Sequence, residues 1–230
     1  MIKRLAIIPA RGGSKRIKNK NLKFFCGKPL IYYSIKALQQ SDIFSKIHVS
    51  SDSIKILNYS NKQKIKTDFR RPKYLADDKT DINKVLKYVV SKYKSLGKIY
   101  DEVWLVFPNN PFITKKIIID CSKAYKKINF KKNNALMTVT KYNYPINWAQ
   151  KLSSNNYLLP LDKFSLKTRS QDFNAIFCEA GMINVYSNNI FYSKIKKKYF
   201  PFELPLYSSV DIDNIEDFKL AHILFKNQQN

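Results

Sequence analysis

The sequence has 230 residues, 44% of them hydrophobic, which is enough for one substantial core in a single domain. No stretch approaches the roughly 18 consecutive apolar residues of a membrane span, and the three cysteines lack the spacing of a metal site. We therefore expect a cytoplasmic protein that is neither embedded in a membrane nor built on disulfides or zinc.

A formal net charge of +25 at pH 7 suggests nucleic-acid binding, but the distribution of the cations argues against it. The lysines are scattered over the whole chain, and asparagine is abundant throughout as well, which indicates a compositional bias rather than one basic face. Arginine occurs only six times, so a retained arginine more often serves a bidentate contact. We expect no nucleic-acid partner.

Residues 3–8 form a short apolar run with the length and β-branching of a buried strand. After Pro9 the chain combines small residues with cations, in the order Ala10, Arg11, Gly12, Gly13, Ser14, Lys15 and Arg16. The glycine pair allows the backbone to approach an anion closely, and the cations, with Lys20, neutralise its charge. The spacing matches neither G-x-x-x-x-G-K-[ST] nor G-x-G-x-x-G. The segment is explained by a phosphate site or by an ordinary turn.

The elements that follow alternate between helical and strand-like spacing. In chain order we expect a helix at 28–40, a strand at 47–50, a helix at 54–61, a helix capped by Thr80 or Asp81, a strand at 102–107, a helix at 114–126 and a strand at 135–140. Strand, loop, helix and strand make a right-handed βαβ unit, which implies a parallel sheet.

Residues 142–176 differ from the rest because they are aromatic-rich, polar and only weakly periodic. We expect an extended hairpin or flap there, inserted into a single domain that spans residues 1–230. Strand character resumes at 182–187, and a helix with Asn214 as its cap covers 215–225.

Asp211 and Asp213 flank one isoleucine shortly before this last helix, at the expected end of a strand. In a strand, residues two apart face the same side, so both carboxylates can reach one hard cation. Magnesium bound to triphosphate oxygens needs only one or two carboxylates. A solvated turn or a helix cap explains the same pattern.

Three stretches together resemble the signature of the CMP-sugar synthetases. The opening match consists of Ile8-Pro9-Ala10-Arg11-Gly12-Gly13-Ser14-Lys15, then Lys20-Asn21, then Gly27-Lys28-Pro29-Leu30. Residues 210–218 resemble the C-terminal metal motif of the family, and Arg71 with Asp78 resembles its R-P-x-x-L-x-x-D element. The resemblance covers nearly the whole chain and is strongest at 5–31 and 207–220.

These cytidylyltransferases activate sialic acids and related nine-carbon keto acids with CTP. The resemblance implies a three-layer α/β/α fold with a mixed, mainly parallel sheet of the nucleotide-diphospho-sugar transferase type and a dimerisation flap at about 142–176. It also implies a homodimer and Mg²⁺ as cofactor. The anomeric hydroxyl of the sugar would attack the α-phosphorus of CTP and release pyrophosphate. Such chemistry depends on positioning and charge neutralisation, and a metal-linked water is the expected proton acceptor.

The resemblance also assigns roles by position. The expected nucleotide-binding residues are Ala10, Arg11, Gly12, Gly13, Ser14, Lys15, Lys20, Asn21, Arg71 and Asp78. The expected metal ligands are Asp211 and Asp213, and the expected sugar-binding residues are Asn109, Arg169 and Gln171. Arg11, Lys20 and Asp211 are the expected catalytic residues. A surface ion pair explains Arg71 with Asp78 or Arg169 equally simply, and a turn explains Asn21.

The stretches 141–149 and 168–172 resemble the pseudaminic acid branch of the family more than the sialic acid branch. Two segments depart from the family pattern. Phe107-Pro108-Asn109-Asn110-Pro111 stands in place of a Q-P-T-S-P-type turn, and Cys178-Glu179-Ala180-Gly181-Met182 stands in place of His-Asp-Ala-Gly-Gln. Pseudaminic acid is thus the favoured acceptor. The alternatives are sialic or legionaminic acid, or a basic protein that binds nucleotide or nucleic acid without turnover.

Overall fold

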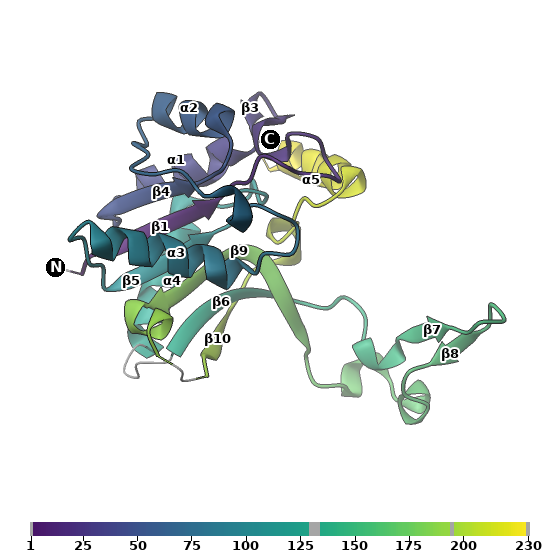
Figure 1. Ribbon diagram of the computed structural model, residues 1–230. Helices are drawn as coiled ribbons and strands as arrows, with labels where there is room; N and C mark the ends of the chain where they lie inside the picture. Colours follow the sequence, from purple (N-terminus) through teal and green to yellow (C-terminus); the bar gives the residue numbers. More distant parts are fainter. Residues whose placement is uncertain (1, 129–133, 194–195, 229–230) are drawn as a thin grey trace.

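The computed structural model describes residues 2–128, 134–193 and 196–228. The strands of its central sheet are β1 (Arg4–Pro9), β4 (Lys46–Ser50), β5 (Glu102–Val106), β6 (Asn134–Lys141), β9 (Phe177–Ser187) and β10 (Lys198–Glu203). They lie in the order β10-β6-β9-β5-β1-β4 (Figure 1). β1 pairs in parallel with β4 and β5, and β10 with β6, whereas β9 is antiparallel to both of its neighbours. The predicted mixed, mainly parallel sheet is therefore confirmed.

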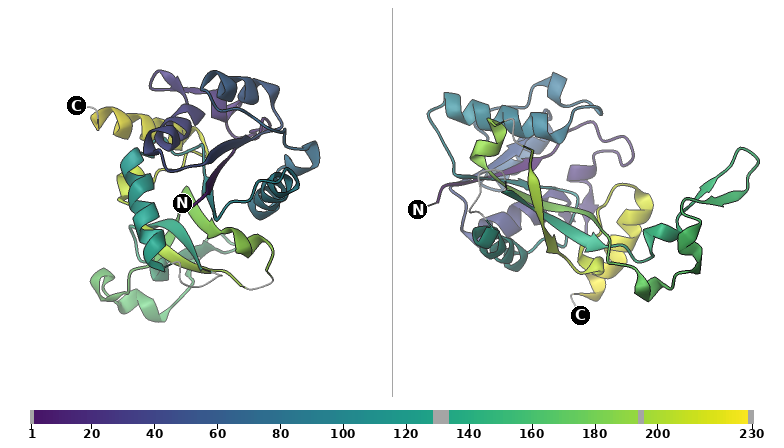
Figure 2. Two further views of the ribbon diagram at one scale, coloured as in Figure 1. Left: turned by 90° about the vertical axis from the view of Figure 1, so that its left-hand side faces the viewer. Right: turned by 90° about the horizontal axis from the view of Figure 1, so that it is seen from below.

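Helices cover both faces of this sheet. They are α1 (Ile31–Ser41), α2 (Ile54–Lys62), α3 (Ile82–Ser95), α4 (Lys115–Ile128) and α5 (Ile215–Asn227). Viewed along the strands, α3 lies on one side of the sheet and α1 and α4 lie on the other (Figure 2). The three layers agree with the predicted α/β/α architecture. Among the described residues no helix has the length and apolar character that crossing a bilayer requires.

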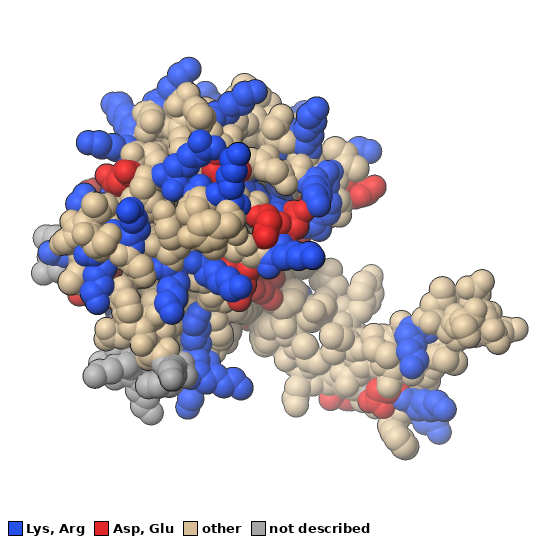
Figure 3. All heavy atoms as spheres, in the orientation of Figure 1, with Lys and Arg blue, Asp and Glu red and all other residues tan. Residues whose placement is uncertain are grey.

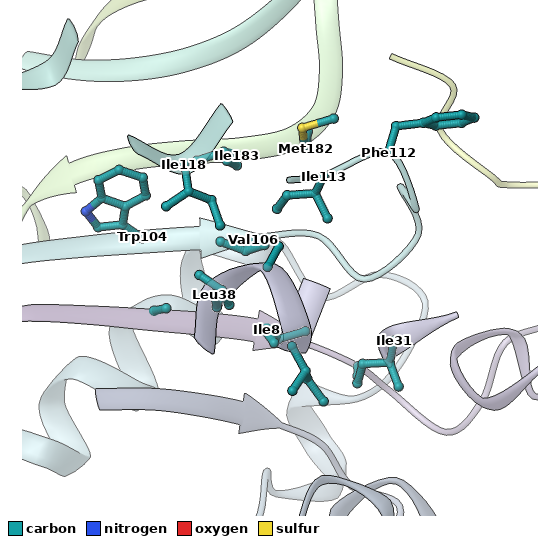
Figure 4. Packing of buried hydrophobic residues seen from close by; sticks show 14 of the residues in the cluster. Ile8, Ile31, Leu38, Trp104, Val106, Phe112, Ile113, Ile118, Met182 and Ile183 are labelled. Carbon is teal, nitrogen blue, oxygen red and sulfur yellow. The ribbon is translucent and has the colours of Figure 1, made fainter. Parts of the chain in front are cut away.

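The alternation of side chains along β1 explains the two layers of core. Ala6 and Ile8 belong to the cluster under α1 and α4, whereas Leu5 and Ile7 belong to the cluster under α3. All four are fully buried, as expected for a parallel strand with helices on both sides. Figure 4 shows the first cluster, in which β1 and β5 side chains pack against Leu38 of α1 and Ile118 of α4. Each valine, leucine or isoleucine buried in this way contributes about 1.5–3 kcal/mol.

Local hydrogen bonds set the starts of three helices. Asp81, one of the two predicted caps of α3, accepts a hydrogen bond from the backbone N–H of Asn83 at 2.8 Å. The Thr114 hydroxyl accepts from the Ile117 N–H at 3.2 Å just before α4. Asn214 and Asp217 form a capping box at α5, as predicted for Asn214. These caps fix where each helix leaves the sheet edge.

A long arm formed by residues 142–176 leaves the body between β6 and β9 (Figures 1 and 2). It carries a hairpin of β7 (Gln150–Leu152) and β8 (Leu158–Pro160), in agreement with the hairpin expected there. Large apolar side chains on it are exposed, including Phe164 at 93%. The dimerising role of this flap stays a prediction.

Three features of the fold differ from the sequence prediction. The expected strand end at 211–213 is irregular backbone, held by the hydrogen bond from Ile212 N–H to the Asn109 carbonyl at 3.0 Å rather than by a neighbouring strand. β10 was not expected, because its lysine and proline disguise an edge strand. A short hairpin of β2 (Phe24–Phe25) and β3 (Lys28–Pro29) also delays the start of α1 beyond residue 28.

Candidate functional site

The loop that follows β1 lies at the edge where the parallel strands β1, β4 and β5 end. The Ala10 N–H donates to the Ser50 carbonyl at 2.9 Å, and the Gly12 N–H donates to Asp52 Oδ1 at 2.8 Å. A Cβ at Gly12 would lie 2.9 Å from Ser53 Cβ, so only glycine fits without displacement of the neighbour. The loop is thus fastened to the end of β4, the place where α/β sheets bind ligands.

The first pair of loop cations is bound to one carboxylate. Arg11 Nη1 lies 2.6 Å from Asp78 Oδ1, and the Lys15 ammonium forms an ion pair with the other oxygen of Asp78. Arg11 Nη1 also donates to the Asp77 carbonyl at 2.8 Å. The hydrogen bond from Lys15 and the contacts with Arg11 hold the pKa of Asp78 below its ordinary value. In this structure Asp78 is therefore the ion-pair partner of two cations, Arg11 and Lys15, that are predicted to bind phosphate.

The second pair of loop cations is bound to the acidic segment before α5. Lys20 Nζ lies 3.0 Å from Asp213 Oδ1 and donates to the Ile212 carbonyl at 2.8 Å. Arg16 Nη2 lies 2.8 Å from Asp213 Oδ2. Burial alone would raise the pKa of Asp213, but the hydrogen bonds and charges of Lys20 and Arg16 lower it. The opening loop and the C-terminal acidic segment, both predicted to serve one triphosphate, lie side by side.

Asp211 lies deeper than Asp213 and has no cation directly bound to it in the described part of the chain. Its Oδ1 accepts a hydrogen bond from Asn109 Nδ2. A Cβ at Gly181 would lie 2.7 Å from its Oδ2. Burial first, and then the negative charge of Asp213, raise the pKa of Asp211 to about 7. The ionised form of the Asp211 carboxyl therefore lacks enough nearby positive charge to stabilise it.

A hard divalent cation fits this pair of carboxylates, because it would supply the positive charge that Asp211 is short of. Among the described residues, no three His, Cys, Asp or Glu side chains are grouped closely enough to hold a metal ion by themselves. Two carboxylates suffice where phosphate oxygens and water complete the coordination, which is the usual arrangement for Mg²⁺ on a nucleotide. The donor set therefore suits a metal that arrives with its nucleotide.

A pocket of about 160 Å³ opens between the loop and the start of α2. It is lined by Arg11, Gly12, Asn19, Asn21, Leu22, Ser53, Lys55 and Ile56. Asn21 Nδ2 donates to the Arg11 carbonyl at 3.0 Å, while its Oδ1 is buried with no partner in the described structure. A buried acceptor beside a pocket is available to a ligand donor.

Arg71 is not among the residues that line this pocket; it secures the end of β4. Its Nε donates to Ser50 Oγ at 3.1 Å and its Nη2 donates to the Ser50 carbonyl at 2.6 Å. The guanidinium is buried, and that burial lowers its pKa to about 10. The alternative of an exposed Arg71–Asp78 ion pair is wrong, because Asp78 pairs with Arg11 and Lys15 instead.

The predicted sugar-binding residues lie in two places. Asn109 is part of the site, beside Asp211. Arg169 and Gln171 are exposed residues on the arm, which extends away from the body (Figure 1). In Figure 3, lysine and arginine side chains are scattered over the visible face of the body, and carboxylates lie among them near the base of the arm. The structure thus assembles the nucleotide half of the predicted site within one chain, but not the sugar half.

Sequence reasoning missed two contributors to the site. The sequence indicates Arg16 only as a member of the cation cluster, whereas the structure pairs it with Asp213, which is also the partner of Lys20. Gly181 belongs to a segment that departs from the family pattern, and nothing in the sequence indicates that it lies against Asp211. The available signal is a glycine directly before the strand predicted at 182–187, since a glycine within or beside a strand often marks a bulge.

The chain is similar to known proteins in sequence and in fold. A family model described as "Cytidylyltransferase" matches residues 5–229. A pseudaminic acid cytidylyltransferase of Campylobacter jejuni is 36% identical over 98% of this chain and 97% of its own length. A CMP-N,N'-diacetyllegionaminic acid synthase of Legionella pneumophila is 28% identical over 98% of this chain and 97% of its own length. A solved CMP:2-keto-3-deoxy-manno-octonic acid synthetase complexed with CTP shares the fold, with a TM-score of 0.70 at 15% identity over 98% of this chain and 99% of that one.

Proposed function

The chain belongs to the cytidylyltransferase family, and from this membership we propose that it transfers CMP from CTP to the anomeric hydroxyl of a nine-carbon keto sugar acid. Pseudaminic acid is the favoured acceptor, because relatives of that activity match the chain at 35–36% identity over nearly its full length. Sialic and legionaminic acids are the alternative acceptors, since enzymes named for them match less closely. Pyrophosphate is the second product.

The observation that carries the proposal is the meeting of four loop cations with three carboxylates at one sheet edge. These groups are Arg11, Lys15, Arg16 and Lys20, with Asp78, Asp211 and Asp213. A triphosphate carries the negative charge that such cations neutralise, and the glycine loop allows its oxygens to approach the backbone. A structural salt-bridge cluster would not explain why Asp211 has no directly bound cation among the residues that the structure describes.

Each group then has a role in positioning the reactants. Arg11, Lys15 and Lys20 hold phosphate oxygens and neutralise charge that develops on them during displacement of pyrophosphate. Asn21 offers to a donor of the nucleotide its buried Oδ1, which has no hydrogen-bond partner among the described residues, and Arg71 holds the end of β4 in place through Ser50. The assignment of Ala10, Gly12, Gly13 and Ser14 as backbone contacts to phosphate stays part of this proposal.

We propose Mg²⁺ as the divalent cofactor, held by Asp211 and Asp213. When bound, it would neutralise phosphate charge and make a coordinated water more acidic. The carboxylates themselves hold the cation at the place where the loop cations hold the phosphates, so the α-phosphorus is presented to the acceptor with its charge balanced.

We also propose that the arm reaches across to a second copy of the chain in a homodimer. The arm exposes a set of large apolar side chains that a monomer leaves in water, namely Tyr144, Leu152, Tyr157, Leu158, Leu161 and Phe164. Arg169 and Gln171 lie on the same arm, so contact with a second copy would give them a place near a sugar that they lack in one chain. The cytoplasmic location stays a prediction.

An acceptor panel tests the function directly. The purified protein is supplied with CTP, Mg²⁺ and, separately, pseudaminic, legionaminic or sialic acid, and pyrophosphate release is followed. The proposal expects fastest release with pseudaminic acid and none with UTP as donor. The proposal would be contradicted if none of the three sugar acids supported pyrophosphate release and the protein instead bound RNA or DNA in a salt-sensitive way that CTP did not compete with.

A further inference from the structure

Three segments from distant parts of the chain converge on the Asp211 carboxylate. Asn109 follows β5, Gly181 lies within β9, and Asp211 precedes α5. Asn109 Nδ2 donates to Oδ1 of this carboxylate. On the other side, a Cβ at Gly181 would lie only 2.7 Å from Oδ2 and 2.9 Å from Cγ. Each oxygen of the carboxylate is therefore located by a different segment.

We propose that Asn109 is a positioning residue for the reaction, which fixes the orientation of the Asp211 carboxylate, and that Gly181 provides the space in which this carboxylate lies. The inference rests on the proposed function, because it gives Asp211 the role of a cation ligand. It also gives Asn109 a role different from the sugar contact expected from its sequence position. Groups that hydrogen-bond to metal ligands orient those ligands and affect metal affinity.

The surroundings of Asn109 support orientation rather than solvent contact. Its side chain belongs to a residue only 9% exposed, and its carbonyl accepts from the Ile212 N–H at 3.0 Å. The neighbouring Asn110 fixes the same turn, since its Oδ1 accepts from the Phe112 N–H at 3.1 Å. The turn is thereby docked on the acidic segment through its backbone, so the Asn109 side chain is not required for that docking.

The unused atom of Asn109 points to the same conclusion. Within the described structure, Asn109 Oδ1 is buried without a hydrogen-bond partner. An asparagine retained only for fold stability usually satisfies both ends of its amide. Here the described hydrogen bonding of the side chain is with Asp211, which is the group that the site needs to hold still.

Gly181 lies where the pairing of β9 with β6 is irregular. Asn184 pairs with Met137 but Glu179 pairs with Val139, so β9 carries extra residues between them. Gly181 has a φ of +56°, in the left-handed region that favours glycine. Bulges of this kind often redirect the chain beside active sites. This one turns a residue without a side chain toward Asp211.

The test measures Mn²⁺ binding to the protein in the presence of CTP by electron paramagnetic resonance, with activity recorded separately. Asn109→Ala should weaken Mn²⁺ affinity by about 10-fold or more. CTP affinity without divalent metal should stay within about twofold of the wild-type value. In the Asp211→Asn background, Asn109→Ala should have no further effect on Mn²⁺ binding, because it acts through that carboxylate. Asn110→Ala is the matched control, expected to lower the unfolding temperature while Mn²⁺ affinity is retained.

The inference is overturned if Asn109→Ala binds Mn²⁺ as wild type does, or if it weakens Mn²⁺ binding equally in the Asp211→Asn background. If Asn109→Ala does not fold, Gly181→Ala serves instead. Its drop in unfolding temperature should be clearly smaller in an Asp211→Ala background, because the strain at φ remains but the collision is removed. Equal drops would contradict the proposed space for the carboxylate.

Failure of the proposed function gives a different result. A wild-type protein that binds Mn²⁺ with CTP through Asp211, but releases no pyrophosphate with any keto sugar acid, refutes the function and leaves the positioning role intact. A wild-type protein that turns over CTP while Asn109→Ala keeps normal Mn²⁺ affinity refutes only the positioning role. A wild-type protein that binds no Mn²⁺, with or without CTP, refutes both the proposed function and the positioning role of Asn109.

Discussion

Lys20 Nζ lies 3.0 Å from Asp213 Oδ1, although the two residues are 193 positions apart in the sequence. The same ammonium donates to the Ile212 carbonyl at 2.8 Å. The site therefore forms only when the β1 loop and the segment before α5 have both docked on the sheet edge. Cations for a triphosphate and carboxylates for its metal are brought together by this contact.

Asp211→Asn should reduce pyrophosphate release by at least about 100-fold, because an amide is a poor ligand for a hard cation and leaves phosphate charge unbalanced. The unfolding temperature should be unchanged or higher, since the substitution removes a charge that burial and Asp213 both disfavour. Steady-state kinetics measures the loss of activity, and thermal unfolding measures the effect on stability. Near-normal rates with Mg²⁺ would show that Asp211 is not a metal ligand.

For Asp78→Asn, the direction of the change in CTP affinity distinguishes two roles of this carboxylate. In the structure Asp78 pairs with Arg11 and Lys15, so an incoming triphosphate must displace it from both. Removal of this carboxylate should therefore tighten CTP binding by about two- to fivefold at low salt, and less at high salt. Calorimetric titration measures it. The direct nucleotide contact expected from the sequence predicts weaker binding instead, and Asp77→Asn is the neighbouring control.

Stability should depend on pH through His48. Its Nδ1 lies 3.1 Å from the Tyr93 hydroxyl, which donates to Asp68 at 2.6 Å, and burial lowers the pKa of His48 to about 3. The unfolded chain binds this proton near pH 6.5, so the free energy of unfolding is fully retained above that pH and falls as the pH drops toward 3. About 2 kcal/mol should be lost by pH 5.

Urea unfolding at pH 7.5 and pH 5 measures this loss. His48→Gln should flatten the dependence, because glutamine does not titrate, whereas His222→Gln keeps His48 and serves as the comparison. An equal pH dependence in wild type and His48→Gln would mean that other groups are responsible.

The arm predicts a concentration-dependent dimer. Leu158 and Phe164 are 64% and 93% exposed on it, and a second copy would cover such side chains. The double substitution Leu158→Ser with Phe164→Ser should shift the mass toward the monomer in size-exclusion chromatography with light scattering. Ile99→Ser, an exposed apolar residue of the body at 62%, is the control. A wild-type monomer at all concentrations would rule out the arm as a dimer contact.

The sequence predicted the parts of this molecule that depend on local pattern. β1 is marked by a continuous apolar run, and the caps Asp81 and Asn214 hydrogen-bond to residues two or three positions away, so these features are predictable from local sequence. The sequence pattern does not indicate β10, because its identity as a strand depends on pairing with β6, which its lysine and proline obscure. The strand expected around Asp211 was wrong for the same reason, since long-range contact with Asn109 decides that backbone.

The candidate site divides along the same line. Motif spacing identified the loop cations and the two aspartates, and the structure places them together. Which residues they contact is decided by tertiary structure. Asp78 pairing with Arg11 and Lys15, and Asp211 lying against Gly181, follow from loop packing that no local pattern encodes.

A crystal structure with CTP and Mn²⁺, in which anomalous scattering locates the metal, tests the proposed site most directly. We predict one Mn²⁺ peak within bonding distance of carboxylate oxygens of Asp211 and Asp213, with the triphosphate over residues 10–20 and Asp78 released from Arg11 and Lys15. A triphosphate bound elsewhere, or a metal with no ligand from Asp211 or Asp213, would contradict it.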